Sequence, residues 1–391
     1  MRIHKTFLVY LGIAGIALGA ASLAGAQSPL APASPARSFE WHDFFPLPPV
    51  LQRSAKVAEV STGDFSTYVL TTDGVLWAFG MNQGGELGDG STTDRHSPVL
   101  IIRQVKTIAA GGSHALALQI DGTLWGFGSG EDGQLGSHGS GSYPGQIMAG
   151  VVAISAGKKH SLVVKEDRTL WAMGNNDRGQ LGDGTMESQK VPVQVMTDVK
   201  AVAAGNWYSH ALRTDGTVWV FGDNQYGELS DGTTANRDTP VQVIDGVTDL
   251  LDLGECSLAI KEDGSRWIVG LGPTVKIPGL AENGLLPRKL DRSFLEARMY
   301  GSQFMLKDDN TLWASDNNMW GQIGDGTTQP HKTPIKVMDD VRAVAIGFGW
   351  TMVTKTDGTL WAFGRNEWGQ LGDGTTKERH SPVQVVIPVD E

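Results

Sequence analysis

Short apolar runs of about five residues recur along most of the chain, separated by clusters of Gly, Asp and Asn. Near the end they occupy residues 341–345, 351–355, 359–363 and 382–386. Their β-branched and aromatic residues are typical of strands rather than helices. Asp-Gly between the second and third runs favours a two-residue hairpin, since the second turn position needs a positive φ. Proline in the fourth run lacks an N–H group and indicates a strand end or an edge strand. The pattern predicts a unit of four alternating strands.

This unit is repeated seven times. Tryptophan recurs at one position of it, with spacings of 46 or 48 residues, at Trp77, Trp125, Trp171, Trp219, Trp267, Trp313 and Trp361. Periods of this length indicate propellers, solenoids or arrays, and a four-stranded unit cannot bury both of its faces alone. We therefore predict an all-β fold, a seven-bladed β-propeller of four-stranded blades. Because the chain begins and ends inside the repeat, we expect pairing of the chain termini to close the ring.

The beginning of the chain indicates export. Arg2 and Lys5 precede an uncharged stretch at 7–20, and a small-x-small pattern ends at Ala26. We predict a signal peptide over residues 1–26, a Pro/Ala/Ser-rich linker over 27–48 and a single propeller over 49–391. The expected location is periplasmic, cell-surface or extracellular, with no membrane contact after cleavage.

Composition and charge narrow the partners. Glycine supplies 51 of 391 residues, and its excess falls mostly in the turns and loops of the repeat. A net charge of −11 argues against a nucleic-acid partner, because affinity for phosphate backbones needs clustered Lys and Arg. The lone cysteine, Cys256, lies in a strand-like run and is expected to be a buried small hydrophobe. Stability must come from packing, and we expect a monomer.

The residues of the repeat match a known family. The sequence W-A-F-G-R-N-E-W-G-Q-L-G-D-G-T-T at 361–376, with G-G-S-H at 111–114, resembles the repeat of the regulator of chromosome condensation (RCC1-like) family. The resemblance spans roughly residues 49–386 and implies a seven-bladed propeller. It also implies guanine-nucleotide exchange on a small nuclear GTPase and chromatin binding. The apparent export, the acidic charge and the lack of a basic tail argue against nucleotide exchange here, so we interpret the chain as a bacterial-type exported member.

Candidate binding residues gather on one predicted face. Because strand direction alternates, the connections between strands 1 and 2 and between strands 3 and 4 emerge together, on what we call the loop face. Trp and Tyr dominate binding hot spots. The predicted partner-binding residues on this face are Trp207, Tyr208, Tyr226, Trp320, Phe348, Trp350 and Trp368. Packing against the neighbouring blade is the alternative for Tyr226, Trp320 and Trp368, and it stays open for Trp207 and Trp350, which lie off the repeat consensus. Blade 5 lacks the G-x-L-G-D-G loop and is either degenerate or a notch for a partner.

Signals for metal or catalysis are weak. His114 and His160 occupy equivalent repeat positions, which favours packing and hydrogen bonding to the next blade over metal binding. Asx turns explain a second recurring set more simply than a Ca²⁺ loop does: Asp89, Asp183 and Asp373, with Asn82, Asn175 and Asn366. Hydrolase, zinc-protease and P-loop motifs are absent, and the one G-x-G-x-x-G, at 128–133, leads into a loop. We predict no catalytic, cofactor-binding or metal-ligating residues.

These observations predict an exported, non-enzymatic binding or scaffold propeller that recognises a protein or cell-envelope partner through its loop face. Two alternatives stay open. Aromatic platforms also stack on sugar rings, so the propeller could bind glycans, or it could inhibit a secreted hydrolase.

Overall fold

The computed structural model describes residues 54–252, 256–270, 285–290, 294–299 and 302–390, with the backbone alone for 294–299. The predicted signal peptide and linker lie outside these residues and stay predictions. Within the described residues, no helix is long and apolar enough to cross a membrane.

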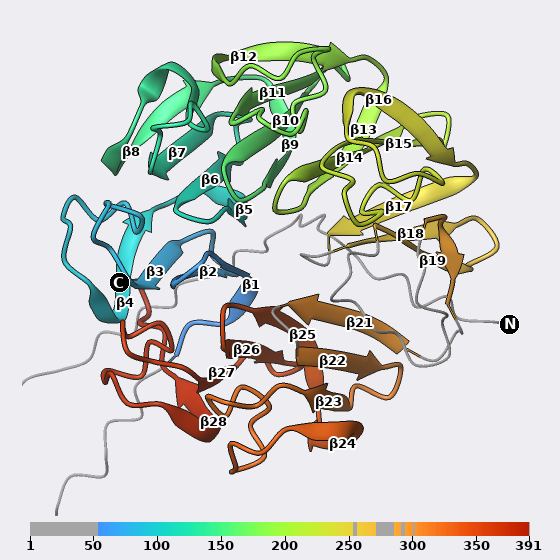
Figure 1. The fold of residues 1–391 in the computed structure, drawn as a ribbon. Coiled ribbons are helices and arrows are strands. Elements are labelled where there is room, and N and C mark those ends of the chain that lie inside the picture. The colour runs from blue at the N-terminus through green and yellow to red at the C-terminus, as the bar shows by residue number, and fades with distance from the viewer. Residues whose placement is uncertain (1–53, 253–255, 271–284, 291–293, 300–301, 391) are drawn as a thin grey trace, which may run out of the picture. The chain divides into compact units, whose positions relative to one another are not determined.

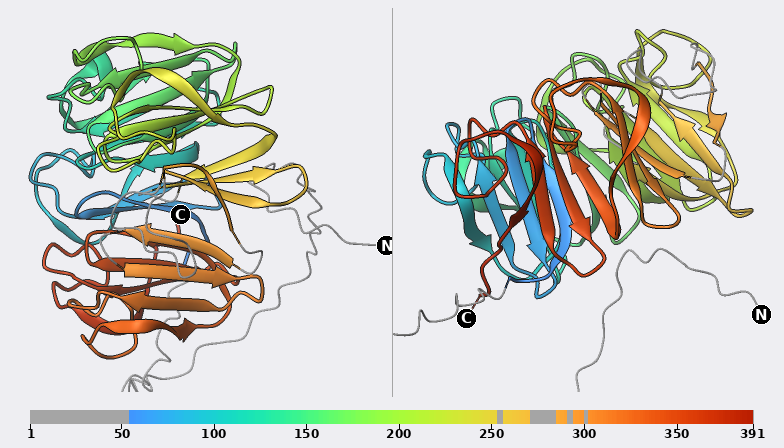
Figure 2. Two further views of the ribbon diagram at one scale, coloured as in Figure 1. Left: turned by 45° about the vertical axis from the view of Figure 1, so that its right-hand side comes forward. Right: turned by 90° about the horizontal axis from the view of Figure 1, so that it is seen from below.

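Seven four-stranded antiparallel sheets are arranged around a ring within residues 52–391 (Figure 1). Seen from its edge, the strands of each blade run across the thickness of the ring, and the loops emerge on two opposite faces (Figure 2). Each sheet follows chain order, with the first strand innermost and the fourth outermost. The predicted all-β, seven-bladed propeller of four-stranded blades is confirmed.

The first four blades share one strand pattern. Blade 1 contains β1 (Val57–Thr62), β2 (Ser66–Thr71), β3 (Leu76–Gly80) and β4 (Arg95–Ile102). Blade 2 contains β5 (Val105–Ala110), β6 (His114–Gln119), β7 (Leu124–Gly128) and β8 (Gly141–Met148), with a short 3₁₀ helix, η2 (Gly136–His138), before β8. Blade 3 contains β9 (Val151–Ala156), β10 (His160–Lys165), β11 (Leu170–Gly174) and β12 (Gln189–Met196). Blade 4 contains β13 (Val199–Ala204), β14 (Tyr208–Arg213), β15 (Val218–Gly222) and β16 (Arg237–Ile244).

The remaining blades differ at blade 5. It contains β17 (Val247–Asp252), β18 (Ser257–Lys261), β19 (Arg266–Val269) and β20 (Arg288–Lys289), so its fourth strand has two residues. Blade 6 contains β21 (Phe294–Met299), β22 (Ser302–Lys307), β23 (Leu312–Asp316) and β24 (His331–Met338). Blade 7 contains β25 (Val341–Ile346), β26 (Trp350–Lys355), β27 (Leu360–Gly364) and β28 (Arg379–Val385). Blade 5 keeps four strands despite its lost loop motif, and Cys256, directly before β18, is buried as expected.

Local chemistry explains these elements. The turn glycines between second and third strands adopt positive φ, 82° at Gly74 and 85° at Gly358. Arg168 and Asn310 occupy the same turn position at φ of 65° and 63°, a conformation that costs a residue with a Cβ atom. Pro382 lies inside β28 rather than at its start, but β28 is an edge strand, as the missing N–H group requires.

The core lies between neighbouring blades. A phenylalanine on the third strand of each of several blades packs beneath a loop glycine of the preceding blade. A Cβ atom at Gly88 would lie 2.6 Å from the Phe127 ring, and one at Gly372 would lie 2.7 Å from the Phe79 ring. The second contact joins blade 7 to blade 1, so the interaction that packs consecutive blades also closes the ring.

Closure differs from the prediction in one respect. Every blade is built from four consecutive strands, so among the described strands no sheet combines the first and last parts of the ring. The chain enters at a first strand and leaves after a fourth strand, which removes the offset that terminal strand pairing would need. The two ends of the described region meet outside the sheets, where the Ala55 N–H donates to the Ile387 carbonyl at 2.9 Å. The Arg342 guanidinium of β25 also donates to the Val57 carbonyl of β1 at 2.6 Å.

Candidate functional site

The connections between first and second strands lie side by side on one face. The Asp64 N–H donates to the Gly112 carbonyl at 2.9 Å, and the Gly112 N–H donates to the Lys158 carbonyl at 3.1 Å. The Lys158 N–H continues this series to Asn206 at 3.3 Å. These backbone bonds connect blades 1 to 4 and fix the backbone of the loop face, whatever side chains it carries.

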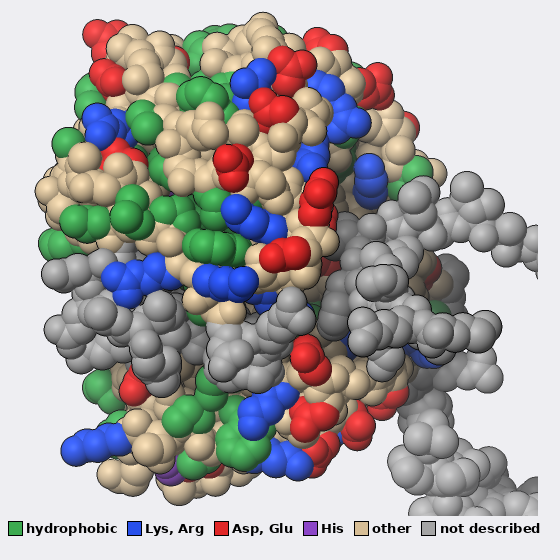
Figure 3. Space-filling view, turned by 90° about the vertical axis from the view of Figure 1, so that its right-hand side faces the viewer, with side chains coloured by type: hydrophobic (Ala, Val, Ile, Leu, Met, Phe, Trp, Pro, Cys, Tyr) green, Lys and Arg blue, Asp and Glu red, His purple; other side chains and the backbone are tan. Residues whose placement is uncertain are grey.

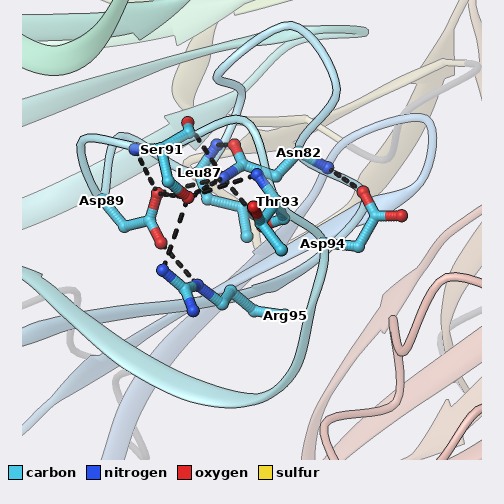
Figure 4. Close-up of polar contacts among 7 residues, drawn as sticks. All are labelled: Asn82, Leu87, Asp89, Ser91, Thr93, Asp94 and Arg95. Carbon is cyan, nitrogen blue, oxygen red and sulfur yellow. Dashed lines mark hydrogen bonds and ion pairs between the residues drawn. The ribbon is translucent and has the colours of Figure 1, made fainter.

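The longer connection between third and fourth strands is stiffened by one asparagine, shown for blade 1 in Figure 4. The Asn82 amide donates to the Asp89 carboxylate at 3.0 Å, and its carbonyl accepts the Leu87 N–H at 3.0 Å. Asp89 also pairs with Arg95 at 2.5 Å. Burial raises the pKa of Asp89, but hydrogen bonds from Ser91 and Arg95 hold it below its usual value overall. Residues of the loop itself therefore already form hydrogen bonds and an ion pair with the Asp89 carboxylate.

The same Asn–Asp bond, 3.0 or 3.1 Å long, recurs in other blades, between Asn176 and Asp183, Asn224 and Asp231, Asn318 and Asp325, and Asn366 and Asp373. The loop-stiffening interpretation is confirmed, with one correction: the blade 3 partner is Asn176, whereas Asn175 donates to Asp132 and Asp177. Among the described residues, no three His, Cys, Asp or Glu side chains gather in a way that could hold a metal ion.

The recurring histidines are interior groups. A ring nitrogen of His114 shares a hydrogen bond with the Ser161 hydroxyl of the next blade at 3.0 Å, and His160 does the same with Ser209 at 2.9 Å. Both rings are fully buried, and desolvation lowers their pKa values to about 4 and about 3. The predicted hydrogen bonding to the next blade is confirmed.

Two predicted binding residues belong to this buried set. Trp350 is 0% exposed and Tyr208 is 5% exposed, so the prediction that they contact a partner is wrong. They occupy the repeat position of the histidines, and each ring covers a glycine three residues earlier. A Cβ atom would lie 2.2 Å from the ring at both Gly347 and Gly205. The G-x-x-His spacing, which these aromatics share, was the sequence signal for their burial.

The other predicted residues do reach the surface. Tyr226 is 61% exposed on blade 4 and makes no aromatic ring contact within the described part of the chain. Trp207 on blade 4 and Trp368 on blade 7 are partly buried. In the part of the chain that the structure describes, no aromatic or cation–ring contact joins these three into one site. Trp320 and Phe348, by contrast, are brought together.

An aromatic cluster forms where blades 6, 7 and 1 meet; we define it as Trp320, Phe348, Phe65 and Arg365. The Trp320 and Phe348 ring centroids are 5.6 Å apart, and the Phe348 and Phe65 centroids are 6.1 Å apart at 80°, an edge-to-face contact. The Arg365 guanidinium carbon lies 5.1 Å from the Phe65 centroid, 5.3 Å from that of Trp320 and 5.5 Å from that of Phe348. One cation is thus held among three rings.

The cluster is open to solvent. Its three aromatic side chains are partly exposed, and neighbouring Met319 is 67% exposed. Trp320 lies flat on the chain at Gly349, where a Cβ atom would be 2.7 Å from the ring. Arg365 pairs with Glu367, two residues along the same loop. Aromatic, Met and Arg side chains are the types enriched at protein interfaces.

Two members of the cluster were missed from the sequence. Phe65 was visible as an aromatic residue in a connection between first and second strands, but it lies in the first blade, while its partners lie in the sixth and seventh. Arg365 sits inside the family motif and looks like part of it. Only closure of the ring places the two side chains together.

Equivalent positions elsewhere carry polar groups. At the junction of blades 2, 3 and 4, Asp132 occupies the position of Trp320 and Asn175 that of Arg365. The Lys159 ammonium lies 3.1 Å from the Asp132 carboxylate, and the Asn175 amide donates to it at 3.3 Å. Arg178 lies 4.0 Å from Asp223 of the next blade. We call this set the polar junction. Its charges are paired internally.

The first strands enclose a central cavity of about 390 Å³. The Glu59 carboxylate faces it and accepts a hydrogen bond from the Thr107 hydroxyl at 3.0 Å, which joins blade 1 to blade 2. Desolvation raises the pKa of Glu59 to about 7, against the opposing effect of its hydrogen bonds to Thr107 and Ile108. Asp64 and Lys158, 3.9 Å apart, lie on the wall of this cavity.

The outer rim differs from the loop face. On the side shown in Figure 3, Lys and Arg side chains lie beside Asp and Glu side chains without a field of one sign. Mixed charge is typical of a solvated surface. The described side chains visible on this side therefore show no concentration of one charge.

Comparison with known families decides the classification. The model of the RCC1-like domain matches residues 36–300, and that of the regulator of chromosome condensation (RCC1) repeat matches residues 357–391. The chain belongs to the RCC1-like family. RCC1-like propellers commonly mediate protein binding, and the family expected from the repeat is confirmed.

Solved structures agree with this fold. Human WBSCR16 is 21% identical, with a TM-score of 0.68, over 81% of this chain and 96% of that one. Prp20p of Saccharomyces cerevisiae, studied for binding to Gsp1p and histones, is 18% identical, with a TM-score of 0.65, over 81% of this RCC1-like chain and 87% of Prp20p. Both likenesses show the propeller architecture.

One curated relative matches a short segment. Ras guanine nucleotide exchange factor C of Dictyostelium discoideum is 41% identical over 63 residues, which is 15% of this RCC1-like chain and 4% of that protein. The argument against nucleotide exchange gains no support here, because a matched relative is itself named an exchange factor.

Proposed function

We propose that this RCC1-like propeller is an exported, non-enzymatic binding protein that recognises a protein or cell-envelope partner through its loop face. The aromatic cluster is its anchor. Interfaces draw most of their binding energy from a few aromatic and Arg residues near their centre. Trp320, Phe348 and Phe65 supply apolar area beside a fixed cation, and this observation carries the proposal.

The cluster fits a binding role better than the polar junction does. Lys159 and Asp132 already satisfy each other, so a partner would have to separate the pair before gaining a contact. The aromatic rings instead present partly exposed apolar area beside Arg365. Covering a large apolar side chain contributes about 1.5–3 kcal/mol, so two or three rings are enough for an anchor.

Affinity capture tests the anchor. The mature chain, used as bait in envelope and secreted extracts, should retain a partner that the double variant Trp320→Ala/Phe348→Ala loses. Tyr226→Ala is the control, because it removes a more exposed aromatic side chain, from blade 4 and outside the aromatic cluster. Equal capture by the wild type and the double variant would remove the cluster from the proposed site. A glycan array probed with the same three proteins distinguishes a sugar ligand from a protein.

Export is tested separately. Cell fractionation with N-terminal sequencing should find the mature protein outside the cytoplasm and beginning at Gln27, the residue after the predicted cleavage site. Recovery of the intact chain from the cytoplasm would refute export while leaving the binding site open to test.

Nucleotide exchange is the second candidate, favoured by the segment shared with the Dictyostelium exchange factor. The probe is a Ras-type GTPase loaded with a fluorescent GDP analogue, with EDTA-stimulated release as the positive control. Acceleration of release by catalytic amounts of the propeller would support exchange, and spontaneous release rates at all concentrations would reject it for that GTPase.

A further inference from the structure

We infer that the aromatic cluster receives an apolar segment of a protein partner that carries one acidic side chain, and that the carboxylate of this side chain pairs with Arg365. The inference rests on the proposed function of the loop face and specifies its partner chemically. It follows from what the Arg365 guanidinium does and does not contact.

The hydrogen-bonding capacity of Arg365 is largely unused. A guanidinium has five N–H donors, and the carboxylate of Glu367 is the one side-chain group that pairs with it among the described residues. No Arg365 nitrogen is both buried and without a hydrogen bond, although the side chain is only 17% exposed. The unused donors are therefore not sealed from solvent at the cluster, and an incoming acceptor can approach them.

The rings hold this cation in place before a partner arrives. Three aromatic centroids lie within 5.5 Å of the guanidinium carbon, so little side-chain freedom is left to lose on binding. Arg presents a planar fork that matches a carboxylate through two parallel hydrogen bonds. Apolar surroundings exclude water and strengthen such a pair relative to one in open solvent.

Glu367 pairs with Arg365 in the place that we assign to the partner carboxylate. Its side chain is 49% exposed, and it lies only two residues from Arg365 in the same loop. Exposed ion pairs contribute little to stability, so replacing Glu367 by a partner carboxylate costs little. Removing the Glu367 charge should therefore strengthen binding, whereas removing a true contact residue would weaken it.

The surrounding chemistry restricts the rest of the segment. The chain carries a net charge of −11, which repels a strongly acidic partner at long range. Met319 and the rings of Trp320 and Phe348 offer apolar area around the single cation. A segment with one carboxylate among apolar residues fits both conditions, and a polyacidic tail fits neither.

A displayed library of random peptides, fused at both ends so that no terminal carboxylate is free, is selected on the purified mature chain. We expect enrichment of Asp or Glu within apolar sequence. The best peptide and its Asn or Gln counterpart are then synthesised with blocked termini and titrated by calorimetry. The amide peptide should bind the wild type about tenfold more weakly. On Arg365→Gln the two peptides should bind equally.

Two further variants sharpen the test. Arg365→Lys keeps the charge without the fork and should give an intermediate preference. Glu367→Gln should bind the acidic peptide several-fold more tightly, and it keeps the inference testable if Arg365→Gln unfolds. Weaker binding by Glu367→Gln, or an acidic preference that persists on Arg365→Gln, would overturn the inference.

The inference and the proposed function can fail independently. Selected peptides that require Trp320 and Phe348 but show no acidic preference would overturn the carboxylate assignment and leave the loop-face function standing. A selection whose peptides bind Trp320→Ala/Phe348→Ala as well as they bind the wild type, or that enriches nothing, would count against the loop-face function itself.

Discussion

The junction of blades 6, 7 and 1 and the junction of blades 2, 3 and 4 use the same repeat positions for opposite chemistry. Trp320 and Arg365 at the first correspond to Asp132 and Asn175 at the second. In the polar junction the Asp132 carboxylate forms an ion pair with the Lys159 ammonium at 3.1 Å. In the aromatic cluster the rings surround Arg365 but remain open to solvent.

The comparison of the two junctions separates the repeat positions that hold the backbone from those whose side chains differ between blades. Backbone bonds between the connections of blades 1 to 4, and the Asn–Asp bond within the long loops of blades 1, 3, 4, 6 and 7, hold surface positions in place. Side chains at those positions can then change without a change in the fold. Under the proposed function, we expect binding specificity to reside in a few departures from the repeat.

Acid should affect the histidine-bearing blades most. His114, His160 and His210 are buried, and desolvation lowers their pKa values to about 4, about 3 and about 3, well below the ordinary 6.5. The unfolded chain takes up protons first, so their stabilising contribution is complete above pH 6.5 and is lost as the pH falls toward 4. At pH 5 the expected loss is about 2 kcal/mol for each histidine.

Denaturant unfolding between pH 7.5 and 4.5 measures this loss. His160→Gln keeps a hydrogen-bonding partner for Ser209 but removes one titrating group. Its free energy of unfolding should therefore fall less steeply with decreasing pH than that of the wild type. The same pH dependence of the free energy of unfolding in both proteins would show that His160 is not a source of the acid sensitivity.

Two tryptophans from the same predicted set, Trp350 of blade 7 and Trp320 of blade 6, should differ in their effects on stability. Trp350→Ala leaves a cavity beneath Gly347 and should reduce the free energy of unfolding by about 3–5 kcal/mol. The surface variant Trp320→Ala should cost less than about 1.5 kcal/mol but should abolish partner capture. Chemical denaturation of both variants gives the comparison, and similar losses would contradict the assigned burial of Trp350.

Glu59 at the central cavity gives an opposite pH dependence. Its pKa is raised from 4.5 to about 7, so its stabilising contribution is present below pH 4.5 and is lost as the pH rises through 7. Glu59→Gln removes this loss and should gain about 1–3 kcal/mol relative to the wild type between pH 5 and pH 8. A stability difference that does not change with pH would contradict the raised pKa of Glu59.

The polar junction should be the least sensitive region. Lys159→Ala breaks an ion pair in which the lysine side chain is 46% exposed, so the expected loss is below about 1 kcal/mol and smaller in high salt. Partner capture should be unchanged. If Lys159→Ala abolished capture while Trp320→Ala did not, the assignment of the two junctions would be reversed.

Much of the fold was predictable from residues that repeat. Trp361 with its Asp-Gly turn, and Pro382 on an edge strand, predicted the blade because each reports a local backbone requirement. The site was only half predictable. Tyr208 and Trp350 look exposed beside a loop until their spacing from Gly205 and Gly347 is considered, since burial depends on what a ring covers.

By itself, the sequence determined the blade, its copy number and the family, because local turn chemistry and a constant period need no knowledge of distant contacts. Tertiary structure alone decided how the ring closes and which aromatic residues become a site. Phe65 lies on the first blade, and Trp320 and Arg365 lie on the sixth and seventh. They meet because packing of Phe79 against Gly372 joins blade 7 to blade 1, a contact between the two ends of the repeat array that no local pattern encodes.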